Sequence, residues 1–240
     1  MLVRLAAAVR GRCDAEALAV MAAARRRLLA DTTELLLHDP GAGPGGRGGG
    51  VRRSTVAAVA RRSSGAAAYH RLLCRLAELA GDGIILELGT ALGLGTLALA
   101  AGAPAATLHT IEGDPALARR AATLFRQQGL RRTTLHTSTF DEVLPSLTRR
   151  LPRLDLLFLD GHHEKDATLR YFSLLLPLLH PESLVIVDDI RWSRGMWQAW
   201  QTLRRHHRVT ASVDLLRMGI LLFEPAPHRR RLTWWPHLSH

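Results

Sequence analysis

The chain has 240 residues, 47% of them hydrophobic, and a formal net charge of +11 at pH 7. This length accommodates one substantial α/β domain with a large buried core, and the lack of any run of about 18 uncharged apolar residues excludes a membrane-spanning helix. A basic surface attracts nucleic acid, anionic membranes or acidic substrates. The arginines are scattered in pairs and triplets, however, and Lys165 is the only lysine, so coding bias explains the charge better than a binding patch does.

Two features near the start of the chain bear on its cellular compartment. Cys13 and Cys74 are the only cysteines, they lie far apart, and they match no metal motif, which favours a reducing compartment. The apolar stretch from Met1 to Val9 is interrupted by Arg4 and lacks the core of a signal peptide. We therefore expect a cytoplasmic protein.

Helical patterns dominate the first part of the chain. Alanine, leucine and arginine are frequent over residues 14–38, which predicts a helix with Asp14 at its N-cap. The segment 39–50 reads DPGAGPGGRGGG and predicts a flexible loop.

A second helical pattern covers residues 54–80, with Ser54 as the N-cap and a break near 63–65. We therefore expect residues 1–80 to form an N-terminal helical region with one mobile loop. Either this region only covers the sheet that follows, or it acts as a lid over the active site.

From residue 83 onward, short apolar runs alternate with helical patterns, which predicts right-handed crossovers and a mostly parallel sheet. Residues 209–215 and 219–223 are joined by a short link and predict an antiparallel hairpin. The expected fold is an α/β, Rossmann-like, seven-stranded sheet with an antiparallel last strand and helices on both faces, over residues 81–225, before a basic tail at 226–240. The other strands are expected at 84–88, 107–111, 133–137, 154–159 and 184–187, each followed by a helix, at 95–101, 115–128, 140–149, 165–179 and 195–206.

The most informative motif is the glycine-rich turn that follows the first of these strands. Gly89, Gly93 and Gly95 let the backbone turn sharply and approach a ligand closely. A strand that leads into a glycine loop at the start of a helix forms a cradle for a nucleotide-like ligand. The chain is therefore expected to be an enzyme.

Four motifs in this order, ELGTALGLGT (87–96), TIEGDP (110–115), LFLDGHH (157–163) and VDDIRWS (187–193), each fall at a strand end. Together they resemble the class I S-adenosylmethionine-dependent methyltransferases over residues 83–224. The LDGHH and VDDI pair is most similar to small-molecule O-methyltransferases of the catechol and sugar types. The resemblance implies transfer of a methyl group from S-adenosylmethionine to a hydroxyl of a small molecule.

The resemblance also implies which residues bind S-adenosylmethionine. A carboxylate that follows the second strand accepts hydrogen bonds from both ribose hydroxyls, the methionine part lies above the glycine loop, and the adenine lies beyond the third strand. Thr90, Thr96 or backbone N–H groups are the candidates for binding the methionine carboxylate. The cofactor set so implied is Glu87, Gly89, Thr90, Gly93, Gly95, Glu112, Ser138, Thr139, Phe140 and Asp160.

Asp160, Asp188 and Asp189 end two neighbouring strands, where their carboxylates would repel one another unless a positive charge lay between them. A divalent cation such as Mg²⁺ meets that need. In metal-dependent O-methyltransferases, matching positions hold such an ion, which lowers the pKa of the substrate hydroxyl. Alternatively, Asp160 contacts the amino group of the cofactor, and one of the paired aspartates caps the following helix.

His162, His163 and Lys165 lie just past Asp160 and are the candidate general bases, with hydrogen-bonding duties alone as the other interpretation of the histidines. Trp192 is a candidate wall for the acceptor. The spacing of Trp197 and Trp200, by contrast, indicates a helix face packed on the core.

Two other classes of function stay open at this stage. A dehydrogenase or an aminopropyl transferase uses the same sheet and a similar glycine motif. A nucleic-acid-binding protein or an RNA methyltransferase would exploit the charge, but a compact basic stripe with interleaved aromatics is lacking. The expected partner is a small-molecule acceptor, without nucleic acid or a membrane span, and a homodimer is left open.

Overall fold

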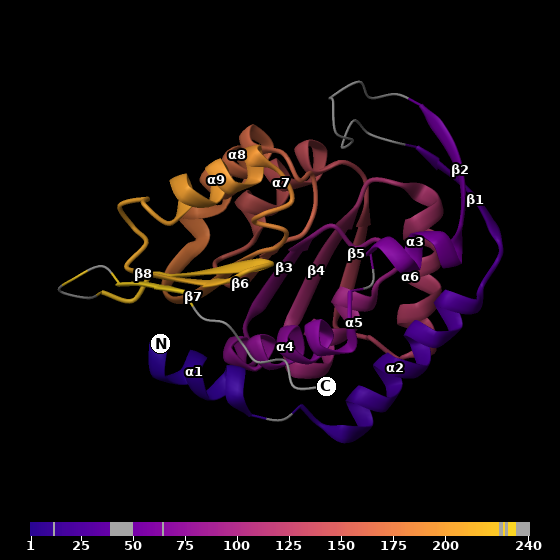
Figure 1. Ribbon diagram of the computed structural model, residues 1–240, viewed down its shortest axis with the longest axis horizontal. Coiled ribbons are helices and arrows are strands. Elements are labelled where there is room, and N and C mark those ends of the chain that lie inside the picture. Colours follow the sequence, from indigo (N-terminus) through magenta and orange to yellow (C-terminus); the bar gives the residue numbers. More distant parts are fainter. Residues whose placement is uncertain (12, 39–49, 64, 226–227, 229, 234–240) are drawn as a thin grey trace.

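The computed structural model describes residues 1–11, 13–38, 50–63, 65–225, 228 and 230–233. A central sheet is covered by helices on both faces, and the first two helices run along the outside of one helical layer (Figure 1). The predicted α/β architecture is therefore confirmed.

Within the described residues the sheet has eight strands, in the order β10-β8-β9-β7-β6-β3-β4-β5. β9 is antiparallel to both of its neighbours, β7 and β8, whereas the other pairings are parallel. The predicted hairpin and parallel strands are thus confirmed. The strands are β3 (Ile84–Leu88), β4 (Thr107–Glu112), β5 (Thr133–Thr137), β6 (Leu154–Leu159), β7 (Leu179–Val187), β8 (Ala211–Leu215), β9 (Met218–Leu222) and β10 (Arg230–Thr233).

Two details of the sheet differ from the prediction. The eighth strand, β10, comes from the basic tail and pairs with β8, whose backbone groups would otherwise form an open edge. β7 starts at Leu179, because the preceding helix α8 (Lys165–Leu175) stops before Pro177 and continues only as the 3-10 turn η2 (Leu176–Leu178). Proline cannot donate the backbone hydrogen bond that an α-helix needs.

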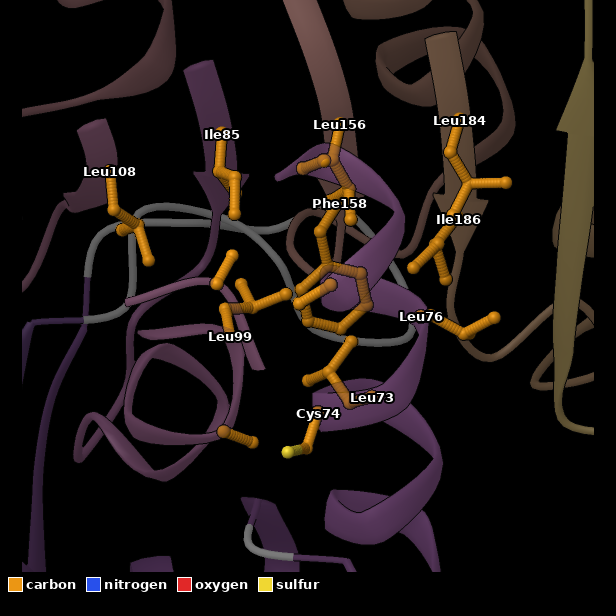
Figure 2. Packing of buried hydrophobic residues seen from close by; sticks show 14 of the residues in the cluster. Leu73, Cys74, Leu76, Ile85, Leu99, Leu108, Leu156, Phe158, Leu184 and Ile186 are labelled. Carbon is orange, nitrogen blue, oxygen red and sulfur yellow. The ribbon is translucent and has the colours of Figure 1, made fainter. Parts of the chain in front are cut away.

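Each face of the sheet buries a hydrophobic cluster. Figure 2 shows Leu73 and Leu76 of α4 and Leu99 of α5 packed beneath Leu156 and Phe158 of β6. The helices on this face are α4 (Ala67–Ala77), extended by the 3-10 turn η1 (Glu78–Ala80), α5 (Leu94–Gly102) and α6 (Pro115–Gln127). The other face is covered by α7 (Phe140–Arg150), α8 and α9 (Arg194–Leu203).

The N-terminal region is less helical than predicted. It holds α1 (Leu2–Arg10), α2 (Ala15–Ala30) and α3 (Val56–Ser63), together with a hairpin of β1 (Glu34–His38) and β2 (Val51–Thr55). Asp14 caps α2 as predicted, since its side chain accepts from the N–H of Ala17 at 2.8 Å.

The helix predicted over residues 14–38 is wrong beyond Ala30. Leu35 and Leu37 are buried while their neighbours are exposed, an alternation that suits a strand packed on one side. Ser54, the predicted N-cap of the second helix, lies in β2. The hydroxyl of Thr55, just before α3, instead accepts from the N–H of Ala58 at 3.1 Å. The predicted flexible loop, apart from Gly50, lies outside the described residues.

Cys13 and Cys74 form a disulfide, with their Cα atoms 6.6 Å apart. The bond ties the segment after α1 to α4, which carries part of the buried core. Their wide separation in sequence hid this contact, and the pairing removes the argument for a reducing compartment, because disulfides persist where conditions are oxidising.

No helix in the described part of the chain is long and apolar enough to cross a membrane.

Replacing both cysteines with serine should lower the free energy of unfolding by about 4 kcal/mol, because the bond closes a long loop in the unfolded chain. Urea denaturation of the wild type and the double variant measures the difference. Dithiothreitol is the control: it should bring the wild type to the stability of the variant and leave the variant unchanged. Equal stabilities without reductant would contradict this expectation.

Candidate active site

The carboxyl ends of the parallel strands β7, β6, β3 and β4 lie along one edge of the sheet, which we call the rim. The predicted site residues lie at this rim or in the loops that follow it. Backbone bonds extend the ladder past the strand ends: the N–H of Asp160 donates to the Leu88 carbonyl and that of Asp188 to the Leu159 carbonyl, both at 2.9 Å. Consequently the residues after β3, β6 and β7 lie beside one another, as the sequence predicted.

The glycine loop between β3 and α5 is tightly folded. Gly89 and Gly93 have φ angles of 105° and 86°, which favour glycine. A Cβ atom at Gly89 would lie 2.4 Å from the carbonyl oxygen of Asp160. The loop therefore packs directly against the end of β6, and its backbone is the part exposed to a ligand.

Glu87 lies beneath this loop. Its Oε2 accepts from the hydroxyls of Thr96 at 2.5 Å and Thr110 at 2.6 Å, and Thr110 also contacts the Thr90 hydroxyl at 2.5 Å. All four side chains are buried, and Oε1 of Glu87 has no hydrogen-bond partner in the described part of the chain. Burial raises the pKa of Glu87 to about 7, so near neutrality this carboxyl is protonated in part of the molecules and ionised in the rest.

Glu112 joins the end of β4 to the glycine loop. Its carboxylate accepts from the backbone N–H groups of Ala91 at 2.7 Å and Asp114 at 2.9 Å. Burial raises the pKa of Glu112 to about 7. Asp114 caps α6 and also accepts from the N–H of His38 at 2.6 Å. The hairpin that the sequence did not predict is thus anchored beside Glu112.

The segment after β5 is organised by a helix cap. Thr139 is the N-cap of α7, and its hydroxyl accepts from the N–H of Glu142, whose side chain in turn accepts from Ser138 and from the N–H of Thr139. The hydroxyls of Ser138 and Thr139 are therefore engaged. A Cβ atom at Gly113 would meet nothing closer than the Ser138 carbonyl oxygen at 3.9 Å, which leaves room between the ends of β4 and β5.

Arg217 supplies positive charge among the three aspartates. This residue lies in the turn between β8 and β9, where its Nη2 is 3.0 Å and its Nε 3.3 Å from the two oxygens of Asp188. Its Nε is also 3.2 Å from Oδ1 of Asp189. Burial raises the pKa of Asp160 well above the usual carboxyl range, and the charge of Asp188 raises it further.

The described residues contain no group of three or more His, Cys, Asp or Glu side chains placed to hold a metal ion. In this arrangement Arg217 already contacts both oxygens of Asp188, so the rim as it stands does not fit a divalent cation. The metal site at Asp160, Asp188 and Asp189 is thus a prediction that this geometry does not support. The helix-cap alternative is wrong, since Ser193 caps α9 by accepting from the N–H of Met196.

The two loop histidines point to different surroundings. Nε2 of His163 lies 3.8 Å from Asp189 Oδ2 and 4.0 Å from Asp160 Oδ1. His162 has a φ of 53°, and its Nδ1 is 2.9 Å from the hydroxyl of Tyr171, on the side of α8. Only His163 therefore faces the acidic rim.

Aromatic side chains and one lysine complete the surroundings. Trp192 is 66% exposed, with its ring centre 6.3 Å from that of His163. Trp200 is fully buried in the core as predicted, but the prediction is wrong for Trp197, which is exposed and lies under the Arg191 guanidinium instead. Lys165 is exposed at the start of α8. Phe140 packs edge-on against Tyr171 and His162.

Sequence reasoning missed Arg217 and Tyr69, the latter in α4. The Arg217 guanidinium lies 4.6 Å from the centre of the Tyr69 ring, and the Tyr69 hydroxyl is buried near Asp188. Burial raises the pKa of Tyr69, and the charges of Asp160 and Asp188 raise it further. The sequence did indicate that the three aspartates need a positive charge beside them. It did not indicate which of the many arginines supplies that charge.

Comparisons with known proteins agree with this geometry. Residues 86–190 match the family model of the methyltransferase domain. The chain is 33% identical over 129 residues to Rv1703c of Mycobacterium tuberculosis, described as a probable O-methyltransferase, and the match covers 50% of this chain and 54% of that protein. The chain thus spans about half the length of this curated relative.

Solved structures show the same fold. The O-methyltransferase TomG of Streptomyces achromogenes, in complex with SAM, has a TM-score of 0.60 at 24% identity, covering 68% of this chain and 82% of that chain. Cofactor-bound Rv0187 of M. tuberculosis has a TM-score of 0.63 at 20% identity, covering 89% and 92%. The family model thus confirms the predicted resemblance to methyltransferases over residues 86–190, and the solved structures confirm the fold.

The buried carboxyl of Glu87 predicts that stability falls as the pH rises. Its pKa is about 7 in the folded chain, against 4.5 ordinarily. Between these values the folded chain holds a proton that the unfolded chain has lost, so raising the pH favours unfolding. The loss amounts to at most about 3 kcal/mol and is complete above the folded pKa.

Glu87→Gln removes this titration, because the amide stays neutral and its oxygen still accepts from Thr96 and Thr110. Urea denaturation at a series of pH values from about 5 to about 8 measures the free energy of unfolding across this titration. The plot of that free energy against pH should be flatter for the variant than for the wild type. Parallel profiles would contradict the assignment.

Proposed function

We propose, on the premise that residues 86–190 form a methyltransferase domain, that this protein transfers a methyl group from S-adenosylmethionine to a hydroxyl oxygen of a small molecule. One observation carries the proposal: Glu112, the glycine loop and His163 occupy the same rim at the ends of adjacent strands. Ligands of open α/β sheets bind at this edge.

The residues of the rim fit an adenosyl ligand. Glu112 accepts the ribose hydroxyls, and the backbone of the loop from Gly89 to Gly93 lies under the methionine part. The room beside Gly113 and the apolar ring of Phe140 receive the adenine. Ser138 and Thr139 shape this end through the cap of α7. Gly95 keeps the first turn of α5 close to Glu87, where a Cβ atom would lie 2.7 Å from Oε1.

When bound, S-adenosylmethionine supplies an activated methyl group: the acceptor oxygen forms the new O–C bond while the C–S electron pair returns to sulfur, leaving S-adenosylhomocysteine. The chain must hold the acceptor in line and take up the hydroxyl proton. His163 receives that proton, because it is the candidate base that faces the rim. His162 is engaged with Tyr171, and Lys165 is exposed at the start of α8.

Trp192 forms one wall of the acceptor site, since its exposed ring lies beside His163. The acceptor is a small molecule, in keeping with the resemblance to O-methyltransferases. The homodimer and the cytoplasmic location stay predictions, and the disulfide between Cys13 and Cys74 weighs against the latter.

Calorimetric titration with S-adenosylhomocysteine tests the cofactor site. Affinity should rise by up to about tenfold per pH unit below pH 7 and level off above it, because the ribose hydroxyls favour an ionised Glu112, whose pKa in the ligand-free chain is about 7. Glu112→Gln should weaken binding by about 10- to 100-fold and flatten the pH dependence. Lack of binding by the wild type at millimolar ligand would overturn the proposed function.

A matched pair of variants tests the base. In an assay of S-adenosylhomocysteine release against a panel of phenols, catechols and sugars, His163→Ala should lower kcat by about 10²- to 10⁴-fold. His162→Ala is the control and should retain most of the activity, because its ring contacts Tyr171 on the α8 side. Equal losses in both variants would remove His163 from the role of base.

A further inference from the structure

We propose that Arg217 takes the place of a divalent cation at this rim, as the fixed positive group that pairs with Asp188 and Asp189 and positions the acceptor oxygen. The part that concerns the acceptor rests on the proposed methyl transfer. The part that concerns the charge of the rim stands on geometry alone.

Arg217 is held in place from several sides. The β8–β9 turn that carries it is tied to the rim by the N–H of Ile190, which donates to the Arg217 carbonyl at 2.9 Å. Leu216, beside it in the turn, has a φ of 70°. The ring of Tyr69 lies against the guanidinium, 4.6 Å from its centre. The guanidinium is therefore built into the rim by three separate elements: the hairpin turn, the segment after β7, and α4.

The contacts of Arg217 use the oxygens that a metal would need. A hard divalent cation binds carboxylate oxygens directly. Nη2 is 3.0 Å from Oδ2 of Asp188, and Nε is 3.3 Å from Oδ1 of the same residue. Nε is also 3.2 Å from Oδ1 of Asp189. Asp188 is fully buried, so its charge has to be met inside the protein rather than by water. The fixed guanidinium thus pairs with the two carboxylates that an exchangeable metal ion would otherwise bind.

Arg217 also keeps donors for a ligand. A guanidinium has five N–H groups in a planar fork. The contacts to Asp188 and Asp189 engage Nε and Nη2, and the Arg217 side chain remains 44% exposed. His163 contacts Asp189 from the other side, at 3.8 Å. An acceptor oxygen bound by the exposed edge of the guanidinium would therefore lie close to the base that takes its proton.

The test is a titration of the full chain, stripped with EDTA, with Mn²⁺, in which the free ion is measured by electron paramagnetic resonance. The wild type should show no saturable site up to about 1 mM, the weak end of protein sites for hard cations. Arg217→Ala frees the carboxylates and should bind Mn²⁺ at least about tenfold more tightly than the wild type. The added change Asp188→Asn should abolish the binding gained.

Two further variants guard the interpretation. Arg120→Ala is the matched control, because Arg120 is also a half-buried arginine in an ion pair, 3.0 Å from Asp31. Arg120 lies in α6 and Asp31 follows α2, so this pair is not part of the rim. It should behave as the wild type. Arg217→Lys keeps a cation, so it should stay folded and bind no Mn²⁺ even where the alanine variant fails to fold. Saturable Mn²⁺ binding by the wild type that Asp188→Asn abolishes would overturn the proposal.

The acceptor role is measured with whichever compound of the panel supports turnover. EDTA should leave the wild-type rate unchanged, and Arg217→Lys should raise KM about tenfold or more with a smaller change in kcat, because a single ammonium cannot replace the guanidinium fork. A rate that falls with EDTA and recovers with Mg²⁺ would contradict the proposal. Titration of the wild type with S-adenosylhomocysteine separates the two ideas, since a failure there counts against methyl transfer and leaves the Mn²⁺ result standing.

Discussion

Negative charge gathered at the ends of the parallel strands is the constraint on which the site depends. Acidic side chains that leave water must be protonated, hydrogen-bonded or paired with a cation. All three outcomes occur at this rim. Burial raises the pKa values of Glu87 and Glu112, backbone N–H groups donate to Glu112, and Arg217 pairs with Asp188.

The hydrogen bonds and the ion pair that stabilise these carboxyl groups also determine how the loops are arranged. The glycine loop is bound to the end of β4 through Glu112 and to the strand beneath it through Glu87 and its threonine partners. The β8–β9 turn is bound to the end of β7 through Arg217. The polar groups that prepare the rim for a ligand are therefore the same groups that join neighbouring strands, so a ligand meets a framework already in place.

The N-terminal region contributes to the rim rather than only covering a face of the sheet. α4 brings Tyr69 against Arg217, and the hairpin end at His38 is bound to Asp114 beside Glu112. The disulfide ties α4 to the segment between α1 and α2. Elements that precede the sheet in sequence thus reach both ends of the rim, at Arg217 and beside Glu112.

The amino-acid sequence by itself determined the order of strands and helices from residue 83 to 223, because hydrophobic periodicity and the residues that end each element are local properties. It also determined the edge at which the acidic residues meet, because parallel strands place their carboxyl ends together. It also placed Trp200 in the core. Local pattern did not reveal the β1–β2 hairpin, because Leu35 and Leu37 fit a helix or a strand until β2 pairs with them. Nor did it reveal the pairing of Cys13 with Cys74, the strand β10, or the choice between His162 and His163. Only the tertiary structure decided which positive group lies among the aspartates, because Arg217 reaches Asp188 across 29 residues of chain through the antiparallel return of β9, and a contact of that kind leaves no mark on either local sequence.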